Sequence, residues 1–314
     1  MNVDLSTIFN MSLINSTFRA STPIIYAALC AAITQQANIL NVGTEGIMLI
    51  GSFTAVTFSY ITGSWVIGVL AAMIAGCLIS GLIGIGHIKF NADITAIGMG
   101  VNLFALALTR LLLQVLFGVN GSFSSPYIKA IPRISIGFFS KIPIIGSIFN
   151  NLTITEWLLL PTIILLYFVI YKTPYGLHLR AVGAFPEAAK TAGINTTRKK
   201  YESLLIAGLV GGLAGAHLSL GYSAQFVNNM TNNRGFMGIA AMFFGGANPI
   251  YTSLGCLLFG FADSIGARLQ SYGLPAQFVL MLPYIVTILV LTISVYAKIK
   301  TDKRKESSLV KREV

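Results

Sequence analysis

The chain has 314 residues, of which 55% are hydrophobic and only 10% are charged. Soluble domains carry about 25% charged residues, so the composition excludes a soluble domain. The net charge of +11 is concentrated in residues 172–202 and in the tail from residue 298, which favours basic cytoplasmic segments of a membrane protein over a nucleic-acid-binding surface.

Uncharged windows in the first half exceed the roughly 20 apolar residues that span a hydrocarbon core. We expect residues 1–19 to form an N-terminal arm, before a transmembrane permease region over residues 20–297. Its first spans are expected at residues 20–36, 47–61, 65–86 and 94–117. Residues 118–153, which are rich in Gly, Ser, Pro and Asn, predict an extracytoplasmic loop with a helix at the membrane interface.

The second half continues with a span at residues 157–171, a polar loop at 173–202 and a span at 204–220. The polar stretch 222–234 is expected outside the membrane. Residues 236–244 form a short apolar segment that is either a span or re-entrant. Further spans are expected at 250–262 and 277–296, followed by a basic cytoplasmic tail at 298–314.

The predicted fold is all-α: a polytopic helical membrane protein with about nine membrane segments, in a range of eight to ten. Of the 21 Lys and Arg residues, six lie in residues 172–202 and seven in the tail. Because cytoplasmic loops carry excess positive charge, both segments are expected in the cytoplasm. Counting back from the tail then places the N-terminus outside.

Two breaks in the apolar pattern, Asn38–Gly46 and Gly245–Pro249, fall in the two halves of the chain. Irregular backbone at membrane depth persists only inside protein or beside water, and matching breaks indicate a transport path between repeats. The alternative is a pair of simple interfacial turns. The residues proposed to line such a path are Asn38, Asn41, Glu45, Asn102, Asn248 and Asp263.

Other polar residues among the spans have plainer interpretations. Asp93, Arg110 and Arg268 are candidates for anchoring helix ends, and Asn102 could instead form a helix–helix hydrogen bond. Two glycine pairs spaced four apart, Gly208/Gly212 and Gly211/Gly215, lie on adjoining faces of one predicted helix. Such small residues predict close helix packing.

The polar loop predicts a short helix of about two turns. Pro186 suits the first helical position, Glu187 favours the positive end of the helix dipole, and Gly193 suits the left-handed residue after it. Asn195 can cap the next helix, near Thr196. Ala188, Ala189 and Ala192 offer small side chains for another surface to approach. The alternative is an ordinary cytoplasmic loop.

Several motifs are similar to one family of proteins. Leu40–Gly51, LNVGTEGIMLIG, resembles the segment that marks the branched-chain amino acid, ribose and nucleoside permeases of ATP-binding cassette (ABC) importers, with Thr44 where an apolar residue is expected. Further similarity covers Gly176–Gly183, Ala188–Asn195, Arg234–Phe236, Phe244–Pro249 and Leu258–Asp263. Glu187-Ala188-Ala189 resembles the loop that couples such permeases to their ATPase.

The resemblance implies a subunit of a bacterial cytoplasmic membrane importer that translocates nucleosides. Alternative substrates are a ribose- or galactose-like sugar and a branched-chain amino acid. Its implied partners are an ATPase subunit, a second permease, an extracytoplasmic binding protein or lipoprotein, a small-molecule substrate and the lipid bilayer, without nucleic acid. The implied ATPase-coupling residues are Pro186, Glu187, Ala188, Ala189, Ala192 and Gly193.

The chain is not expected to be an enzyme, and no catalytic residue, cofactor or metal is predicted. It contains no G-x-x-x-x-G-K-[ST] or H-E-x-x-H motif, and its three cysteines have no metal-like spacing. His87, His178 and His217 are far apart in sequence, and no carboxylate cluster is expected beside them. Two rival functions stay open: an ion-coupled secondary transporter using Glu45 or Asp263, and an uncoupled channel or scaffold.

Overall fold

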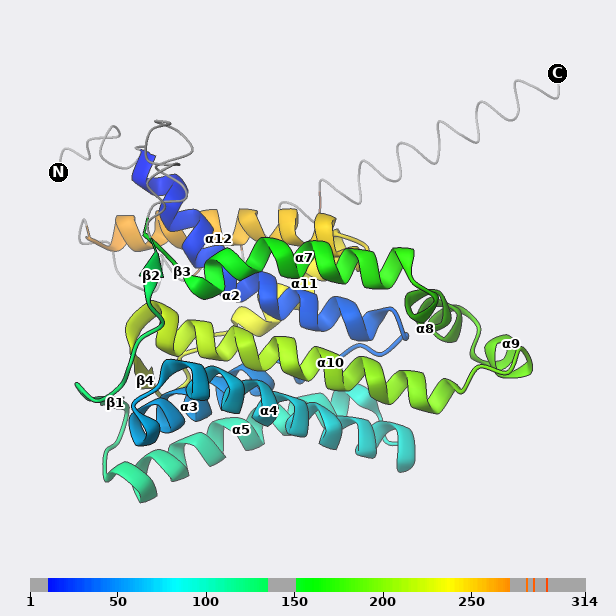
Figure 1. Ribbon diagram of the computed structural model, residues 1–314, viewed down its shortest axis with the longest axis horizontal. Coiled ribbons are helices and arrows are strands. Elements are labelled where there is room, and N and C mark those ends of the chain that lie inside the picture. The colour runs from blue at the N-terminus through cyan, green and yellow to red at the C-terminus, as the bar shows by residue number, and fades with distance from the viewer. Residues whose placement is uncertain (1–10, 135–150, 272–280, 282–284, 286–291, 293–314) are drawn as a thin grey trace.

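The computed structural model describes residues 11–134, 151–271, 281, 285 and 292, and within them the chain is mainly helical (Figure 1). The α-helices are α2 (Met11–Gln35), α3 (Thr44–Thr62), α4 (Trp65–Gly84), α5 (Ile94–Phe117), α7 (Ile154–Lys172), α8 (Pro174–Ala184), α9 (Pro186–Thr191), α10 (Thr196–Ala216), α11 (Arg234–Phe244) and α12 (Pro249–Ser271). Two π-helical turns, η1 (Ile85–Lys89) and η3 (His217–Ser223), continue α4 and α10.

In the part of the chain that the structure describes, four short strands add to the predicted all-α fold. They are β1 (Ser122–Ser124), β2 (Arg133–Ile134), β3 (Leu152–Thr153) and β4 (Gln225–Val227). β1 pairs with β4 and β2 pairs with β3, both antiparallel. The strands lie at one end of the bundle, the sheet end, and α8 and α9 lie at the opposite end, the α9 end (Figure 1). Backbone pairing of this kind satisfies loop groups that no helix accommodates.

The membrane-protein prediction is confirmed at the level of helices. Among the described residues, five helical stretches are long and apolar enough to cross a membrane: Trp65–Lys89, Ile94–Phe117, Ile154–Lys172, Thr196–Ser223 and Pro249–Gln270. α2 and α3 lie largely inside the bundle, where residues 20–34 of α2 are all buried. The total of about nine segments and the orientation of the termini stay predictions, since the expected span at 277–296 falls almost wholly outside the described residues.

Some element boundaries differ from those expected. α2 begins at Met11, so half of the expected N-terminal arm is helix. The polar loop contains an additional helix, α8, because Thr173 caps it and Pro174 occupies its first position. For the expected extracytoplasmic loop, residues 118–134 and 151–153 are described and contain no helix, and residues 135–150 lie outside the described part of the chain.

Two rows of glycine seat α10 between α3 and α4. The row of Gly208 and Gly212 faces α4, where a Cβ on Gly208 would lie 2.7 Å from the Cα of Cys77. The row of Gly211 and Gly215 faces α3, where a Cβ on Gly215 would lie 2.6 Å from a backbone nitrogen. Since side-chain carbons do not approach that closely, any larger residue would push the helices apart. The predicted packing role of both pairs is confirmed.

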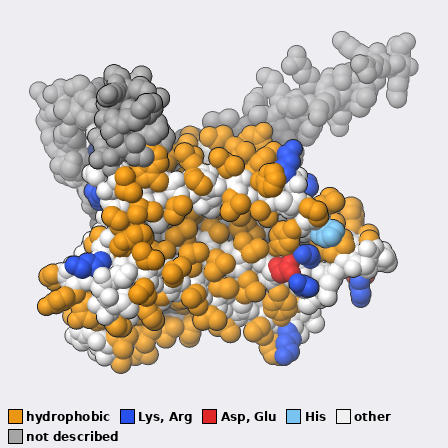
Figure 2. Space-filling view, in the orientation of Figure 1, with side chains coloured by type: hydrophobic (Ala, Val, Ile, Leu, Met, Phe, Trp, Pro, Cys, Tyr) orange, Lys and Arg blue, Asp and Glu red, His pale blue; other side chains and the backbone are white. Residues whose placement is uncertain are grey.

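The outer surface of the bundle is strongly apolar between its ends. Leu78 of α4, Leu103 of α5, Ile164 of α7 and Leu254 of α12 are each more than half exposed. Figure 2 shows hydrophobic side chains across the middle of one face, with charged side chains gathered towards its ends. Exposing this area to water would cost about 25 cal/mol per Å². A lipid environment removes that cost, as expected for a multi-pass membrane protein.

Candidate functional site

The irregular stretch between α2 and α3, residues 36–43, runs back into the bundle; we call it the first interruption. Asn102 of α5 holds it in place. The Gly46 N–H donates to Asn102 Oδ1 over 2.8 Å, and Asn102 Nδ2 donates to the Val42 carbonyl over 3.0 Å. Asn102 lies just over two turns after Ile94, the first residue of α5. The part of the interruption next to α3 is therefore held inside the bundle.

Asn41 shapes the turn that leads into α3. Its Oδ1 accepts a hydrogen bond from the Gly43 N–H over 3.1 Å, and its carbonyl accepts one from the Thr44 hydroxyl over 2.8 Å. The side chain is 1% exposed, and its Nδ2 has no hydrogen-bond partner among the described residues. Asn38, earlier in the same interruption, is exposed and adopts a left-handed conformation with φ of 57°. Asparagine tolerates that region better than most residues.

Glu45 joins the first half of the chain to the second. Its two oxygens accept hydrogen bonds from the backbone N–H groups of Asn233, over 2.9 Å, and Gly235, over 2.7 Å. These donors are at the N-terminus of α11, where a carboxylate is favoured by the helix dipole. A Cβ on Gly235 would lie 2.7 Å from the Glu45 Cα, so only glycine permits this approach.

Residues 222–234, which were expected outside the membrane, pack partly against the bundle. Thr231 is fully buried, whereas Asn229, Asn232 and Asn233 are exposed, and the Asn233 N–H reaches the Glu45 carboxylate. The buried carboxylate satisfies N–H groups that the start of α11 leaves free, and the position of this stretch outside the membrane stays a prediction. α11 itself has 11 residues and is about 16 Å long, half of a bilayer core.

The break after α11, residues 245–248, forms the second interruption. Asn248 Oδ1 accepts a hydrogen bond from the Ile250 N–H over 3.0 Å and so opens α12. The Ala247 carbonyl accepts a hydrogen bond from Gln36 Nε2 over 2.8 Å. The chain around the first interruption consequently contacts both ends of α11, through Glu45, the second residue of α3, at its start and through Gln36 beyond its end. The two breaks predicted from the sequence are brought together.

A cavity of about 460 Å³ opens where these segments meet α8; we call it the α2–α8–α11 cavity. Residues from the end of α2, from the two interruptions and from α8 line it, among them Gln35, Gln36, Asn38, Arg180 and Phe243. Of the residues predicted to line a path, Asn38 borders this cavity. Asn41 and Asn102 hold the first interruption in place by hydrogen bonds, and Glu45 joins α3 to the start of α11.

The predicted short helix in the polar loop is present as α9. Pro186 is its first residue and Glu187 lies in its first turn, while Gly193 adopts a φ of 79° just after it. Asn195 Oδ1 accepts a hydrogen bond from the Arg198 N–H over 2.9 Å and caps α10. The local conformation of the loop therefore agrees with the sequence-based prediction.

The three alanines in and just after α9 do not share one face. Ala189 is 4% exposed, whereas Ala188 and Ala192 are exposed. Neighbouring residues of an α-helix point about 100° apart, and in α9 it is Ala189 that points towards the bundle. The exposed surface of α9 therefore consists of Pro186, Glu187, Ala188, Lys190 and Thr191, continued by Ala192 and Gly193.

Tyr175 anchors α8 on α10. The Lys199 ammonium of α10 lies 4.4 Å from the centroid of the Tyr175 ring. The Tyr175 hydroxyl is buried and has no hydrogen-bond partner among the described residues. Burial, with the Glu202 carboxylate nearby, raises the pKa of the Tyr175 phenol to about 12, so it stays neutral. In addition, Gly183 packs directly on the backbone of Gln36. α8 thus connects α9 to the first interruption.

The remaining ionisable candidates lie away from the cavity. Asp263 forms an ion pair of 2.9 Å with Arg234, the first residue of α11. Asp93 caps α5 by accepting from the Ala96 N–H over 2.8 Å. Arg268 donates to the Ser12 hydroxyl over 2.7 Å and ties α12 to α2. Asp93 and Arg268 therefore anchor helix ends, as the plainer interpretation had it.

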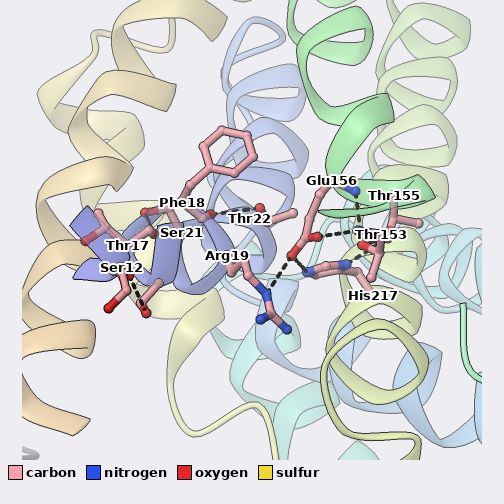
Figure 3. A network of polar contacts seen from close by, with 11 residues as sticks. Ser12, Thr17, Phe18, Arg19, Ser21, Thr22, Thr153, Thr155, Glu156 and His217 are labelled. Carbon is pink, nitrogen blue, oxygen red and sulfur yellow. Dashed lines mark hydrogen bonds and ion pairs between the residues drawn. The ribbon is translucent and has the colours of Figure 1, made fainter. Parts of the chain in front are cut away.

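A buried polar network at the sheet end escaped the sequence-based analysis. Figure 3 shows Arg19 of α2, Glu156 of α7 and His217 of η3 converging. Arg19 Nε and His217 Nε2 lie 3.5 and 4.0 Å from Glu156 Oε1, and Thr155 Oγ1 lies 2.8 Å from His217 Nδ1. Glu156 also accepts from the Thr153 N–H, forming a capping box at the start of α7.

His217 thus has one carboxylate, Glu156, close to its ring, which sequence reasoning did not anticipate. The only trace of Glu156 that the sequence offers is the Thr153-x-x-Glu156 spacing before an apolar run, and that spacing indicates the start of a helix but not a contact with His217. Arg19 is the last residue of the expected N-terminal arm, residues 1–19, for which no buried contact was predicted. Among the described residues, no group of His, Cys, Asp and Glu could hold a metal ion.

Comparison with known proteins adds a family match over most of the chain. A family model described as "Branched-chain amino acid transport system / permease component" matches residues 13–291. The guanosine ABC transporter permease protein NupQ of Bacillus subtilis is 34% identical over 294 residues, covering 89% of this chain and 91% of that protein.

Two further relatives are similar over comparable lengths. The nucleoside ABC transporter permease protein NupC of Lactococcus lactis is 35% identical, covering 87% of this chain and 89% of that protein. The putative glucose ABC transporter permease protein TsgC13 of Haloferax volcanii is 29% identical, covering 94% of both chains.

Proposed function

Since the chain belongs to the family of branched-chain amino acid transport system permease components, we propose that it is the membrane-spanning permease subunit of an ATP-driven importer of nucleosides. The observation that carries the proposed substrate is the similarity to two permeases named for guanosine and nucleosides, each at 34–35% identity over nearly nine-tenths of both chains. The chain is a transport component and not an enzyme; ATP hydrolysis belongs to a separate subunit.

The ATPase subunit docks on the exposed surface of α9 in this proposal. α9 has only six residues, and its exposed side carries Glu187 and the small side chain of Ala188. A helix this short is not stable alone in water, so its fixed conformation suits a contact surface held by the fold. Movement of α9 is passed through α8 to the first interruption, because Gly183 packs on Gln36.

The other partners and the location follow from the same proposal. A second permease covers part of the apolar surface, and an extracytoplasmic binding protein or lipoprotein delivers the substrate at the sheet end. The α9 end then faces the cytoplasm, as the six Lys and Arg residues between Lys172 and Glu202 favour. The location is the bacterial cytoplasmic membrane.

A simple sugar is the second candidate substrate. It is favoured by the similarity to the putative glucose permease of Haloferax volcanii, which extends over 94% of both chains at 29% identity. The binding protein then sets the choice between sugar and nucleoside, because it selects the molecule that reaches the permease. A ribose moiety is common to nucleosides and to one of the expected sugars.

Uptake by the reconstituted importer tests the proposal. The chain is assembled in proteoliposomes with its ATPase, second permease and binding protein, and accumulation of labelled guanosine, adenosine, ribose and leucine is measured with and without ATP. We expect ATP-dependent accumulation of nucleosides that vanadate stops and an uncoupler leaves intact. Accumulation of ribose or leucine alone would overturn the proposed substrate. Uptake that an uncoupler abolishes would instead support an ion-coupled transporter.

A further inference from the structure

We propose that the α2–α8–α11 cavity is a site that receives the nucleoside during import, and that it favours a base with two neighbouring acceptors, such as O6 and N7 of guanine. This inference rests on the proposed nucleoside import and adds to it a place and a chemical preference. The cavity measures about 460 Å³, within the range of roughly 300–1,000 Å³ for small-molecule pockets.

The cavity wall offers polar groups that are not used elsewhere. Gln35 Oε1 is buried and has no hydrogen-bond partner among the described residues, although Gln35 borders the cavity. Leaving such a buried acceptor unpaired is unfavourable. If the Gln35 side chain turns towards the cavity that it borders, a ligand with an N–H group, such as N1–H of guanine, satisfies it. Adenine has no hydrogen at that ring position and cannot donate there.

Arg180 supplies the complementary donors. Its Nε makes a long hydrogen bond of 3.4 Å to the Gly176 carbonyl, and its guanidinium lies over the ring of Tyr171 at 4.9 Å. Among the described residues, no acceptor is bound by its two terminal nitrogens. Arginine presents parallel donors that match O6 and N7 of guanine, whereas glutamine or asparagine matches N6 and N7 of adenine.

The rest of the wall suits an uncharged aromatic ligand. Phe243 borders the cavity with 55% of its side chain exposed, which leaves a ring face available for stacking. No Asp or Glu is among the residues that line the cavity, so nothing there attracts a cation. Gln36 also borders the cavity, but its Nε2 already donates to the Ala247 carbonyl.

The cavity lies beside α8, the helix that leads into α9, on which the ATPase is proposed to dock. Arg180 belongs to α8, which leads directly into α9, and Gln35 ends α2 beside the first interruption. A ligand held by both residues therefore bridges α8, which leads into the proposed docking helix α9, and the end of α2, which leads into the first interruption. Separating α8 from α2 would split the site and release the nucleoside.

The test compares two substrates in one complex. Initial rates of guanosine and adenosine uptake are measured in the fully assembled importer, each supplied at a concentration that saturates the binding protein. For Arg180→Gln, we expect the guanosine-to-adenosine ratio to fall about tenfold, since one bidentate contact discriminates by about 1–3 kcal/mol and 1.4 kcal/mol is tenfold. A ratio is used because assembly or coupling defects affect both substrates equally.

Gln35→Leu gives an independent measurement in case Arg180→Gln does not assemble. It removes the acceptor for N1–H, so the ratio should fall in the same direction. The matched controls are Arg198→Gln, at an exposed arginine of α10, and Gln114→Leu, at an exposed glutamine of α5, and both should keep the wild-type ratio.

The outcomes separate the two proposals. An unchanged ratio in Arg180→Gln and Gln35→Leu, with nucleosides still imported, would overturn the cavity assignment alone. An equal loss of both substrates would show that Arg180 acts in coupling, and would also overturn it. A wild-type importer that transports neither nucleoside would overturn the proposed function itself.

Discussion

At the scale of single residues, Glu45 has the clearest physical role. It is 7% exposed, yet both of its oxygens are hydrogen-bonded to backbone N–H groups at the start of α11. A buried carboxylate is tolerated only with such partners. As a consequence, the residue that the sequence suggested for the transport path, or for ion coupling, serves to fasten the two halves of the chain together.

Replacing Glu45 by glutamine should destabilise the protein. Glutamine keeps the shape but turns one acceptor into an N–H₂ group that faces an N–H donor, and it removes the charge at the helix N-terminus. Because hydrogen bonds to charged groups contribute about 1.5–3 kcal/mol, we expect the free energy of unfolding in detergent to fall by about that amount. The measurement is denaturant unfolding followed by circular dichroism.

The control for this change is Glu187→Gln on the exposed surface of α9, which should leave stability unaltered. Equal stability of the wild type and Glu45→Gln would contradict the fastening role.

The Arg19–Glu156–His217 network is a second buried polar group at this scale. It lies at the sheet end and has the same structural role, because it joins α2, α7 and η3.

At the scale of elements, two adjacent alanines of α9 have different roles: one packs against the bundle and the other is available for docking. Ala189 packs inwards and Ala188 faces outwards. An enlarged side chain at Ala189 would therefore disturb the loop itself. At Ala188, the same enlargement changes only what can dock on the helix.

We expect Ala188→Trp to reduce ATP-driven uptake roughly tenfold or more, because a bulky side chain at a close contact costs at least the 1–2 kcal/mol typical of important interface residues. Thermal stability of the isolated chain should not change. Uptake, copurification of the ATPase and thermal unfolding are measured together. Ala92→Trp, at an exposed alanine in the link before α5, is the matched control. Normal uptake with Ala188→Trp would show that α9 is not the docking surface.

At the scale of the whole molecule, the bundle has an apolar belt between two chemically different ends. The α9 end carries the basic loop, and the sheet end carries the paired strands (Figure 1) and the Arg19–Glu156 ion pair. The buried helices α2 and α3 lie among the apolar helices that form the belt. This arrangement predicts a fixed orientation in the membrane, because the basic end favours the cytoplasm.

Cysteine labelling tests that orientation. In a chain with the half-buried Cys77 replaced by serine, Ser122→Cys at the sheet end should react with a membrane-impermeant maleimide on intact cells. Lys190→Cys at the α9 end should react only after the membrane is permeabilised. Both positions are exposed, so access depends on the side of the membrane. The reverse pattern would contradict the orientation and, with it, docking of a cytoplasmic ATPase on α9.

The sequence by itself determined the membrane class, most helix positions and the conformation of α9. Apolar length, proline and glycine placement and helix caps act over a few residues, so they are readable in order along the chain. The glycine rows of α10 also follow from spacing alone, since residues four apart share a helix face.

Only the tertiary structure decided which distant groups meet. Glu45 bonds residues almost 190 positions later, and Gln36 bonds Ala247, contacts that no local pattern encodes. The same holds for the cavity, whose walls come from α2, α8 and the segment after α11, and for the pairing of Glu156 with His217. Buried polar groups must find partners wherever the fold places them, and that placement depends on packing of the whole bundle.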